Sequence, residues 1–257
     1  MITLASDFGT PYPAAMKGVI LRESDARLVD VSHDLSRGRI GESAFWLRET
    51  LPTFPPATHL AVVDPGVGTD RGVLVGRANG HTFVGPDNGL LVPAARRIAA
   101  DDDGVDWFHA DPGDPESSTF HGRDVFAPLA ATVHDAVAAV GPETLDDHDR
   151  LSPADPIDLR LPEATIEAGD ASGEVLAVDD FGNVVTNVPG EFIEDREAVT
   201  VNGDRVPVVS TFASVEPEAP LVTVGSHGYV ECDVNGGRGA EWFGLAVGDA
   251  VRIDPTG

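Results

Sequence analysis

Short apolar runs alternate with segments of helical apolar spacing over the first 140 residues. The apolar runs predict five strands, at residues 2–5, 28–31, 60–63, 73–76 and 82–84. Apolar residues at helical spacing predict three helices, at residues 14–22, 42–51 and 125–140. This alternation is typical of an α/β domain with a mostly parallel sheet.

The second half of the chain has a different pattern, in which short β-prone runs are separated by turn signals. The runs lie at residues 173–178, 184–188, 199–201, 221–224, 229–234 and 250–253. Turns such as Asn202-Gly203 and Asn235-Gly236-Gly237 separate them, which favours a small β-barrel or sandwich. We therefore expect an N-terminal α/β domain at 1–150, a Pro- and Asp-rich linker at 151–171 and a C-terminal β-barrel or sandwich at 172–257.

Charge excludes several classes of partner. The 257 residues contain 43 Asp and Glu against 17 Lys and Arg, a formal net charge of −26 at pH 7. Such a chain repels nucleic acid and anionic membranes, so neither is an expected partner. Lys17 is the only lysine, and acids occur throughout the chain, which is typical of adaptation to high salt.

The single cysteine and the apolar runs bear on the compartment. Cys232 has no partner for an internal disulfide, which favours a reducing environment. No apolar stretch approaches the roughly 18 residues of a spanning helix, and a core strand is expected from the first residue. We expect a cytoplasmic protein.

Four polar segments are candidates for chemistry, and each has a structural alternative. Asp7 follows a strand and precedes Gly9, where it could bind ribose hydroxyls or cap the next helix. Asp64 follows another strand and shares a glycine-rich turn with Arg71, which could equally be a local ion pair. His121 stands before a helix in His-Gly-Arg-Asp, so this segment could be only a loop that leads into a capped helix. The segment from Asp179 to Asn187 is rich in acids and amides, and its alternative is a hairpin turn.

The same segments, in this order and spacing, resemble the S-adenosylmethionine (SAM) hydroxide adenosyltransferases, the hydrolase branch of the fluorinase and chlorinase superfamily. The resemblance covers nearly the whole chain. Its motifs are TLASDFG at 3–9, MKGVI at 16–20, VSHD at 31–34, VVDPGVGTDR at 62–71, GPDNGLL at 85–91, TFHGRD at 119–124, FGNVVTN at 181–187 and NGG at 235–237.

The resemblance implies a homotrimer of two-domain subunits, with sites between neighbouring subunits and no cofactor besides the substrate SAM. The halogenating branch carries tyrosines at the positions of Asp64 and His121. The hydrolase branch carries an Asp-Arg-His set that matches Asp64, Arg71 and His121, and all three are present here. The resemblance therefore implies conversion of SAM to adenosine and L-methionine.

The chemistry of this reaction explains the need for those residues. Attack at the ribose C5′ carbon expels a neutral thioether, so the demand falls on the nucleophile and no general acid is needed at sulfur. A fixed cation such as Arg71 lowers the pKa of a bound water, and a carboxylate or an imidazole can accept its proton. Either Asp64 or His121 could be that base, and the expected displacement is in line.

The resemblance also implies a set of substrate-binding residues. Asp7 matches the ribose-binding acid, and Asp179 with Asn183 match the pair that holds the amino-acid portion of SAM. The remaining matches are Phe212, Asn235 and Gly236 for adenine and Ser226 with His227 for the methionine carboxylate. His227 replaces an arginine of the halogenating branch.

Two other classes of function stay open. Asp7, His33, Asp34, Asp64, His121 and Asp124 are residue types that ligate metals, so a metal-dependent hydrolase or phosphatase is an alternative. No compact ligand motif supports it, and we expect no metal. A non-catalytic adenosyl- or nucleoside-binding protein is the other alternative.

Overall fold

The chain forms two compact units in a computed structural model, which describes residues 1–257 except 67, 70, 102–103, 114–118 and 256–257. Unit 1 is Met1–Arg160 and unit 2 is Leu161–Gly257. Each unit has its own apolar core and is described by itself below.

Unit 1 is built on a seven-stranded sheet with the order β2-β1-β3-β5-β4-β6-β7. The strands are β1 (Ile2–Ser6), β2 (Leu28–Ser32), β3 (Thr58–Val62), β4 (Val73–Ala78), β5 (His81–Pro86), β6 (Asp106–Ala110) and β7 (Leu151–Pro153). The pairs β1–β2, β1–β3 and β3–β5 are parallel, whereas β4 pairs antiparallel with both β5 and β6. Five strands therefore point the same way, and β4 and β7 run against them.

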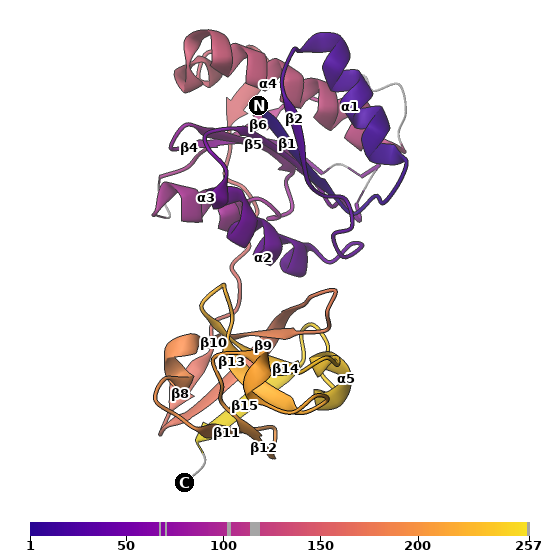
Figure 1. The fold of residues 1–257 in the computed structure, drawn as a ribbon. Helices are drawn as coiled ribbons and strands as arrows, with labels where there is room; N and C mark the ends of the chain where they lie inside the picture. The colour runs from indigo at the N-terminus through magenta and orange to yellow at the C-terminus, as the bar shows by residue number, and fades with distance from the viewer. Residues whose placement is uncertain (67, 70, 102–103, 114–118, 256–257) are drawn as a thin grey trace. The chain divides into compact units, whose positions relative to one another are not determined.

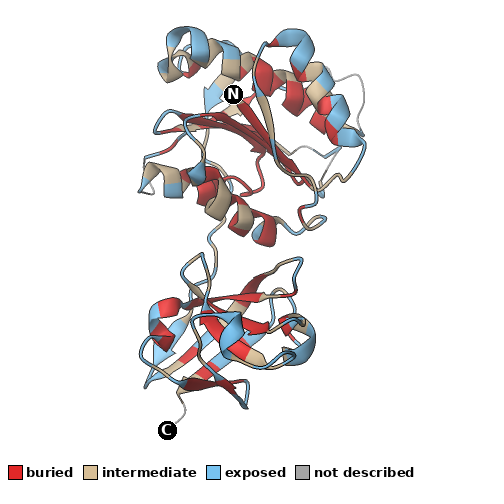
Figure 2. Ribbon diagram, in the orientation of Figure 1, coloured by how far each residue is buried: buried red, intermediate tan, exposed pale blue. Residues whose placement is uncertain are grey.

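Helices cover both faces of this sheet (Figure 1). They are α1 (Tyr12–Glu23), α2 (Ile40–Thr50), α3 (Val92–Ala99) and α4 (Ala127–Val140). Helices α1 and α4 pack on one face around Met16 and Leu129, and α2 and α3 pack on the other around Leu47 and Phe83. Figure 2 shows the result as buried strands between helices that are exposed on their outer sides.

Unit 2 is an antiparallel barrel that is nearly closed. Its strands are β8 (Thr165–Glu167), β9 (Asp170–Val178), β10 (Val184–Pro189), β11 (Ala198–Val201), β12 (Asp204–Pro207), β13 (Pro220–Val224), β14 (Tyr229–Val234) and β15 (Ala250–Pro255), with one short helix, α5 (Gly239–Phe243). The order is β12-β11-β15-β9-β10-β14-β13. After β12, a bridge between Val208 and Val222 of β13 brings the two ends of the sheet together.

The structure confirms the predicted fold class of an α/β unit with a largely parallel core followed by a smaller β-barrel. Helix α3 and strands β6 and β12 were not predicted. The segment at residues 125–140 is also more complex than expected, because a π-helical turn, Gly122–Phe126, precedes α4.

The segment predicted as a linker, 151–171, contains regular structure. Strand β7 extends the sheet of unit 1 by pairing with β6, and β8 pairs with β9 in unit 2. Along the chain, the boundary between the two compact units falls between Arg160 and Leu161.

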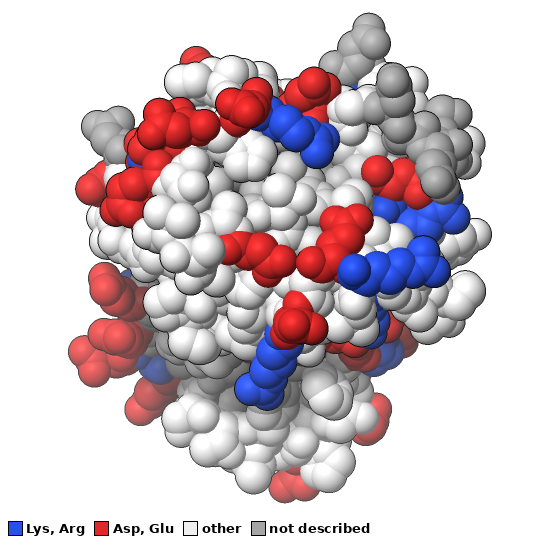
Figure 3. Space-filling view, turned by 90° about the horizontal axis from the view of Figure 1, so that it is seen from above, with Lys and Arg blue, Asp and Glu red and all other residues white. Residues whose placement is uncertain are grey.

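Acidic side chains are scattered over the face of the molecule shown in Figure 3, with basic side chains beside some of them. Among the helices that the structure describes, none combines the length and the apolarity that crossing a membrane requires.

Candidate functional site

The carboxyl ends of β1 and β3 bring Asp7 and Asp64 to one edge of the sheet. These strands are parallel neighbours, and Ser6, the last residue of β1, pairs with Val62, the last residue of β3. Asp7 follows directly, and Asp64 comes two residues after Val62. The carboxyl edge of an open α/β sheet is where such folds bind ligands.

A pocket of about 580 Å³ opens at this edge, and both carboxylates line it. The lining residues are Asp7, Phe8, Tyr12, Arg37, Gly38, Asp64, Pro65, Thr119 and Phe120. The Asp7 carboxylate accepts a hydrogen bond of 2.9 Å from the Gly38 N–H. The predicted alternative, that Asp7 caps α1, is not what the structure shows, because Pro11 occupies the N-cap position without a side-chain hydrogen bond.

Asp64 and Arg71 form an ion pair. Arg71 Nε lies 3.2 Å from Asp64 Oδ1, and the Asp64 side chain is 3 % exposed. Asp64 Oδ1 also accepts a hydrogen bond from the Gly66 N–H, which closes the turn after β3. The contact is an ion pair without a hydrogen bond, and the buried Arg71 Nε has no hydrogen-bond partner among the described residues.

Gly66 makes room for the guanidinium. A Cβ at this position would lie 2.4 Å from Arg71 Nη2 and 2.8 Å from Nε, closer than side-chain atoms can approach. The glycine of this turn therefore allows Arg71 to fold back onto Asp64. Val67 and Asp70, which belong to the same motif, lie outside the described residues.

His121 is half-buried and occupies the N-cap position of the π-helical turn Gly122–Phe126. It follows Phe120, which lines the pocket, and its side chain makes no capping hydrogen bond. The segment therefore leads into a helical turn, as its structural alternative expected, but the His121 side chain does not cap that turn. Ser118, at the start of this segment, lies outside the described residues.

Aromatic side chains form one wall of the pocket, and the sequence analysis missed them. Phe120 makes edge contacts with Phe8 and Tyr12, at centroid distances of 5.8 and 5.2 Å. A Cβ at Gly122 would lie 2.7 Å from the Phe8 ring, so glycine is needed for this packing. The signal available in the sequence was the position of Phe8 and Phe120, each next to a predicted site residue.

In unit 2, Asp179 and Asn183 form a tight pair at the turn between β9 and β10. Asp179 Oδ1 accepts from the Asn183 N–H at 2.8 Å, and Asp179 Oδ2 accepts from Asn183 Nδ2 at 3.0 Å. The Gly182 N–H donates to the Asp179 carbonyl at 2.9 Å. The segment is thus the hairpin turn that was its structural alternative, and it also presents one carboxylate and one amide together.

The other predicted binding residues of unit 2 lie in the loops beside β13 and β14. Ser226 is exposed, and the neighbouring His227 has its Nδ1 3.4 Å from Glu231 Oε1. Phe212 begins an exposed helical turn. Asn235, which precedes Gly236, donates from Nδ2 to the Val215 carbonyl just after that turn, at 2.9 Å.

Two acidic residues beside this group, Glu231 and Asp233, were not predicted. Both are buried, and burial raises the pKa of each. The sequence feature that could have identified them is the alternation of apolar and acidic residues from Val230 to Val234. In a strand, this alternation places the two carboxyl groups on one face.

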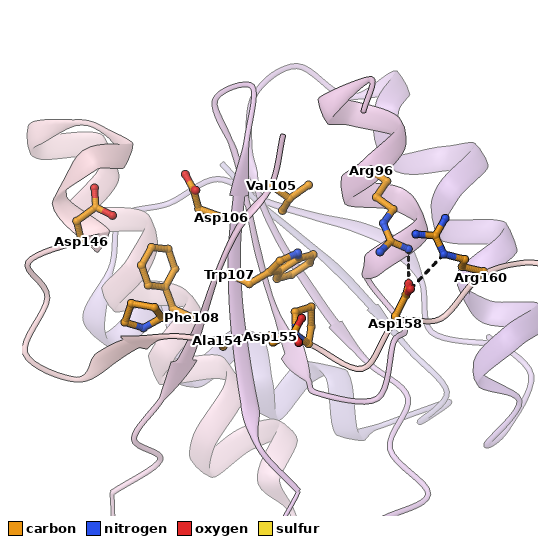
Figure 4. Close-up of a pocket in the computed structure, with 12 residues that line it drawn as sticks. Arg96, Val105, Asp106, Trp107, Phe108, Asp146, Ala154, Asp155, Asp158 and Arg160 are labelled. Atoms are coloured by element: carbon orange, nitrogen blue, oxygen red, sulfur yellow. Dashed lines mark hydrogen bonds and ion pairs between the residues drawn. The ribbon is translucent and has the colours of Figure 1, made fainter. Parts of the chain in front are cut away.

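A second hollow, of about 750 Å³, lies beside β6, and Figure 4 shows that Arg96 and Arg160 both pair with Asp158 there. Arg96 Nη1 contacts Asp158 Oδ1, and Arg160 Nε lies 3.1 Å from Asp158 Oδ2. It contains none of the predicted site residues, so we place the candidate site at the carboxyl edge instead.

Within the described ranges, no three His, Cys, Asp or Glu side chains are grouped so that they could hold a metal ion. Asp7 and Asp64 share the pocket at the carboxyl edge, whereas His33 is engaged with Ser6 and Asp30 and Asp124 with Arg123. The expectation that no metal takes part remains a prediction, to be tested by chelation.

Fold and site together define a two-unit α/β and β-barrel protein with a candidate pocket at the carboxyl edge of the sheet. The profile of the SAM hydroxide adenosyltransferase N-terminal domain matches residues 2–141, and that of the C-terminal domain of the same family matches residues 173–252. The chain belongs to the SAM hydroxide adenosyltransferase family, which confirms the resemblance found in the sequence.

Individual relatives agree with this assignment. The chain is 38 % identical to (R)-S-adenosyl-L-methionine hydrolase of Salinispora tropica, covering 98 % of this chain and 97 % of the relative. It is 41 % identical to the protein of the same name from Thermus thermophilus, covering 96 % and 97 %. Among solved structures, an uncharacterized conserved protein from Thermotoga maritima is similar over 99 % of this chain and 100 % of its own, with a TM-score of 0.83 and 30 % identity.

Proposed function

We propose that this protein hydrolyses SAM to adenosine and L-methionine. Family membership supports the substrate, since relatives that match nearly the full length are named (R)-S-adenosyl-L-methionine hydrolase. The single structural observation that supports the proposal is the Asp64–Arg71 ion pair at the pocket edge, because a carboxylate and a guanidinium side by side are groups that can activate a water.

In the proposed mechanism, Arg71 stabilises the hydroxide that develops from a bound water. Its buried Nε–H has no hydrogen-bond acceptor within the described part of the chain, so it can donate to an oxygen that carries negative charge. Asp64 and His121 orient the water and remove its proton, and either could be the base. Oxygen attacks C5′ in line with the departing sulfur, the C5′–S bond breaks with its electron pair on sulfur, and one proton is released.

The binding roles follow the resemblance. Asp7 binds the ribose hydroxyls, and Asp179 and Asn183 bind the amino-acid portion. Phe212, Asn235 and Gly236 contact adenine, while Ser226 and His227 contact the methionine carboxylate. The resemblance further implies a homotrimer with sites at subunit interfaces. The domain boundaries at 150 and 172 are proposed from the change in sequence pattern.

Product analysis tests the proposal. Incubation with SAM should yield adenosine and methionine in equal amounts, and the yield should persist after exhaustive chelation with EDTA. A protein that returns SAM unchanged would be an adenosyl-binding protein instead. Loss of activity on chelation, with recovery on adding a metal, would favour the metal-dependent alternative.

Three substitutions test the catalytic roles. Asp64→Asn, Arg71→Ala and His121→Ala should each lower kcat by roughly 100-fold or more while KM for SAM changes little, because these groups act on the water. Exposed Asp101→Asn and Arg205→Ala serve as matched controls and should retain wild-type kcat. A variant whose KM rises while kcat stays normal would assign its residue to substrate binding.

A further inference from the structure

Strand β14 carries two carboxyl groups on the face that points away from the barrel core. Val230 and Cys232 belong to the apolar core, so the alternating residues Glu231 and Asp233 point to the other face. Both are buried nonetheless, with Glu231 9 % exposed and Asp233 fully buried.

Strand pairing places Asp233 next to the Asp179–Asn183 pair. Cys232 pairs with Val184, so in this antiparallel register Asp233 comes beside Asn183, the residue before Val184. On its other side Asp233 pairs with Leu221 of β13, which is apolar. Asp179, Asn183 and Asp233 therefore form one row across β9, β10 and β14, and Glu231 lies two residues away from Asp233 on the same face of β14.

Helix α5 packs against β14 at Asp233. A Cβ at Gly239, its first residue, would lie 3.0 Å from the Asp233 Cα and 2.2 Å from the Cys232 carbonyl oxygen, so the helix packs directly on β14. The Ala240 N–H donates to the Gly182 carbonyl at 2.9 Å, which ties the helix to the hairpin.

The surroundings of Asp233 are acidic. Glu231 faces it from its own strand, and Asp179 faces it from the β9–β10 hairpin. His227 lies against Glu231, and Thr223 of β13 pairs with Glu231 and is uncharged. Arg238 and Glu241 lie on the α5 side and form a solvent-exposed ion pair with each other.

Neither carboxyl oxygen of Asp233 has a hydrogen-bond partner among the residues the structure describes. Burial, and then the charges of Glu231 and Asp179, raise the pKa of Asp233 to about 8. At neutral pH this carboxyl group therefore holds its proton. Such an uncompensated buried acid is costly for stability, which points to a role in binding.

The ligand that suits this row is an organic ammonium group. The acids are not grouped as metal ligands in the described part of the chain. An ammonium group donates hydrogen bonds and needs only acceptors around it. The exposed side of the Asp179 carboxylate and the Asn183 amide oxygen are such acceptors. The substrate of the proposed function has one such group, the α-ammonium of its methionine portion.

We propose that Asp233 is a positioning residue that holds a proton in the empty protein and releases it when the substrate α-ammonium binds at Asp179 and Asn183. The inference rests on the proposed function, because that function supplies the ammonium ligand. The incoming positive charge offsets the repulsion among the three acids, so the ionised form of Asp233 becomes favourable. The carboxyl O–H bond breaks, the electron pair stays on oxygen and the proton goes to solvent.

Isothermal titration calorimetry tests this by counting protons. S-adenosylhomocysteine, which has the α-ammonium and no sulfonium to hydrolyse, is titrated at pH 7.5 in molar KCl with phosphate or Tris as buffer. The dependence of the binding enthalpy on the buffer gives the protons released. We expect roughly 0.5–0.8 proton per ligand for the wild type, and none for methylthioadenosine, which lacks the amino-acid portion.

Asp233→Asn should bind S-adenosylhomocysteine without releasing a proton, and the exposed neighbour Asp180→Asn should release as much as the wild type. Absence of release in the wild type, or undiminished release in Asp233→Asn, would overturn the proposal.

If Asp233→Asn does not fold, the pH dependence of ligand binding to the wild type alone tests the proposal. Affinity for S-adenosylhomocysteine relative to methylthioadenosine should rise up to tenfold per pH unit between pH 6.5 and 8 and level off above. A flat ratio would overturn the inference.

SAM turnover is assayed separately. Turnover without proton release on binding would refute this inference alone, and proton release without turnover would refute the proposed hydrolysis alone.

Discussion

At the scale of single residues, the candidate site depends on a guanidinium folded back onto a carboxylate within one turn. Asp64 and Arg71 are seven residues apart, and their contact is fixed by a turn in which Gly66 leaves space. Because this contact is local, the sequence could predict it from the order of residue types. The row of Asp179, Asn183 and Asp233 could not be predicted, because it depends on the register of three strands.

The space at Gly66 leads to a prediction about catalysis. Gly66→Ala should push the Arg71 guanidinium away from Asp64, because the new Cβ would lie 2.4 Å from Nη2. We expect kcat for SAM to fall by roughly 10- to 100-fold with KM within about threefold, since small displacements of positioned groups have effects of this size. Steady-state kinetics measure both constants.

The matched control is Gly18→Ala, in α1, where a Cβ meets nothing within 4 Å. It should leave kcat unchanged. Wild-type kcat in Gly66→Ala would show that the position of Arg71 does not matter.

At the scale of elements, the strands were predicted more completely than the helices. Strands β1, β3 and β5 of unit 1 are buried along their whole length, as parallel strands in the middle of a sheet are. Helix α3 was missed because it has only eight residues and follows directly on the apolar Leu90-Leu91. Strand β6 was missed because it starts with an exposed Asp106 and has a half-buried Trp107.

Two buried histidines connect the strands at the edge opposite the pocket. His59 of β3 lies 2.7 Å from Thr3 Oγ1 of β1 through Nδ1, and 2.8 Å from His81 Nδ1 of β5 through Nε2. Burial, and then the neighbouring His81, lower the pKa of His59 to about 3, and burial also lowers the pKa of His81. Both imidazoles are therefore neutral in the folded protein at neutral pH.

This network predicts a loss of stability in mild acid. Since the pKa of His59 is about 6.5 when unfolded and about 3 when folded, the unfolded state binds more protons between these values. The contribution of His59 to the free energy of unfolding should be nearly constant above pH 7 and fall by about 2 kcal/mol from pH 6.5 to 5. The raised pKa of Asp233 acts in the opposite direction over this range, so the His59 contribution is taken as the difference between the wild type and a His59 variant. Urea unfolding in molar KCl measures it, with salt screening the other charges.

The free energy of unfolding of the wild type minus that of His59→Gln should therefore fall by about 2 kcal/mol from pH 6.5 to 5. His148→Gln, outside the network, should differ from the wild type by a constant amount. A difference between the wild type and His59→Gln that does not change between pH 6.5 and 5 would contradict the assignment of neutral, buried imidazoles.

At the scale of the whole molecule, charge dominates. A net charge of −26 on 257 residues repels itself in dilute buffer, and acidic side chains are spread over the face of the molecule shown in Figure 3. Salt screens this repulsion over about 10 Å at 0.1 M and about 3 Å at 1 M.

We therefore expect Tm to rise by several degrees between 0.1 and 2 M KCl, measured by differential scanning calorimetry at pH 7.5. A Tm that stays constant or falls with KCl would show that self-repulsion does not limit stability. Light scattering on the same samples tests the homotrimer expectation, which requires three times the chain mass.

The central claim is that water supplies the attacking oxygen at C5′, and oxygen isotope transfer tests it most directly. SAM is turned over in water enriched in oxygen-18, and the masses of the products are measured by mass spectrometry. The account predicts adenosine heavier by two mass units, labelled at the 5′ hydroxyl, and unlabelled methionine. Adenosine without the label, or adenine and methylthioadenosine in place of adenosine, would contradict it.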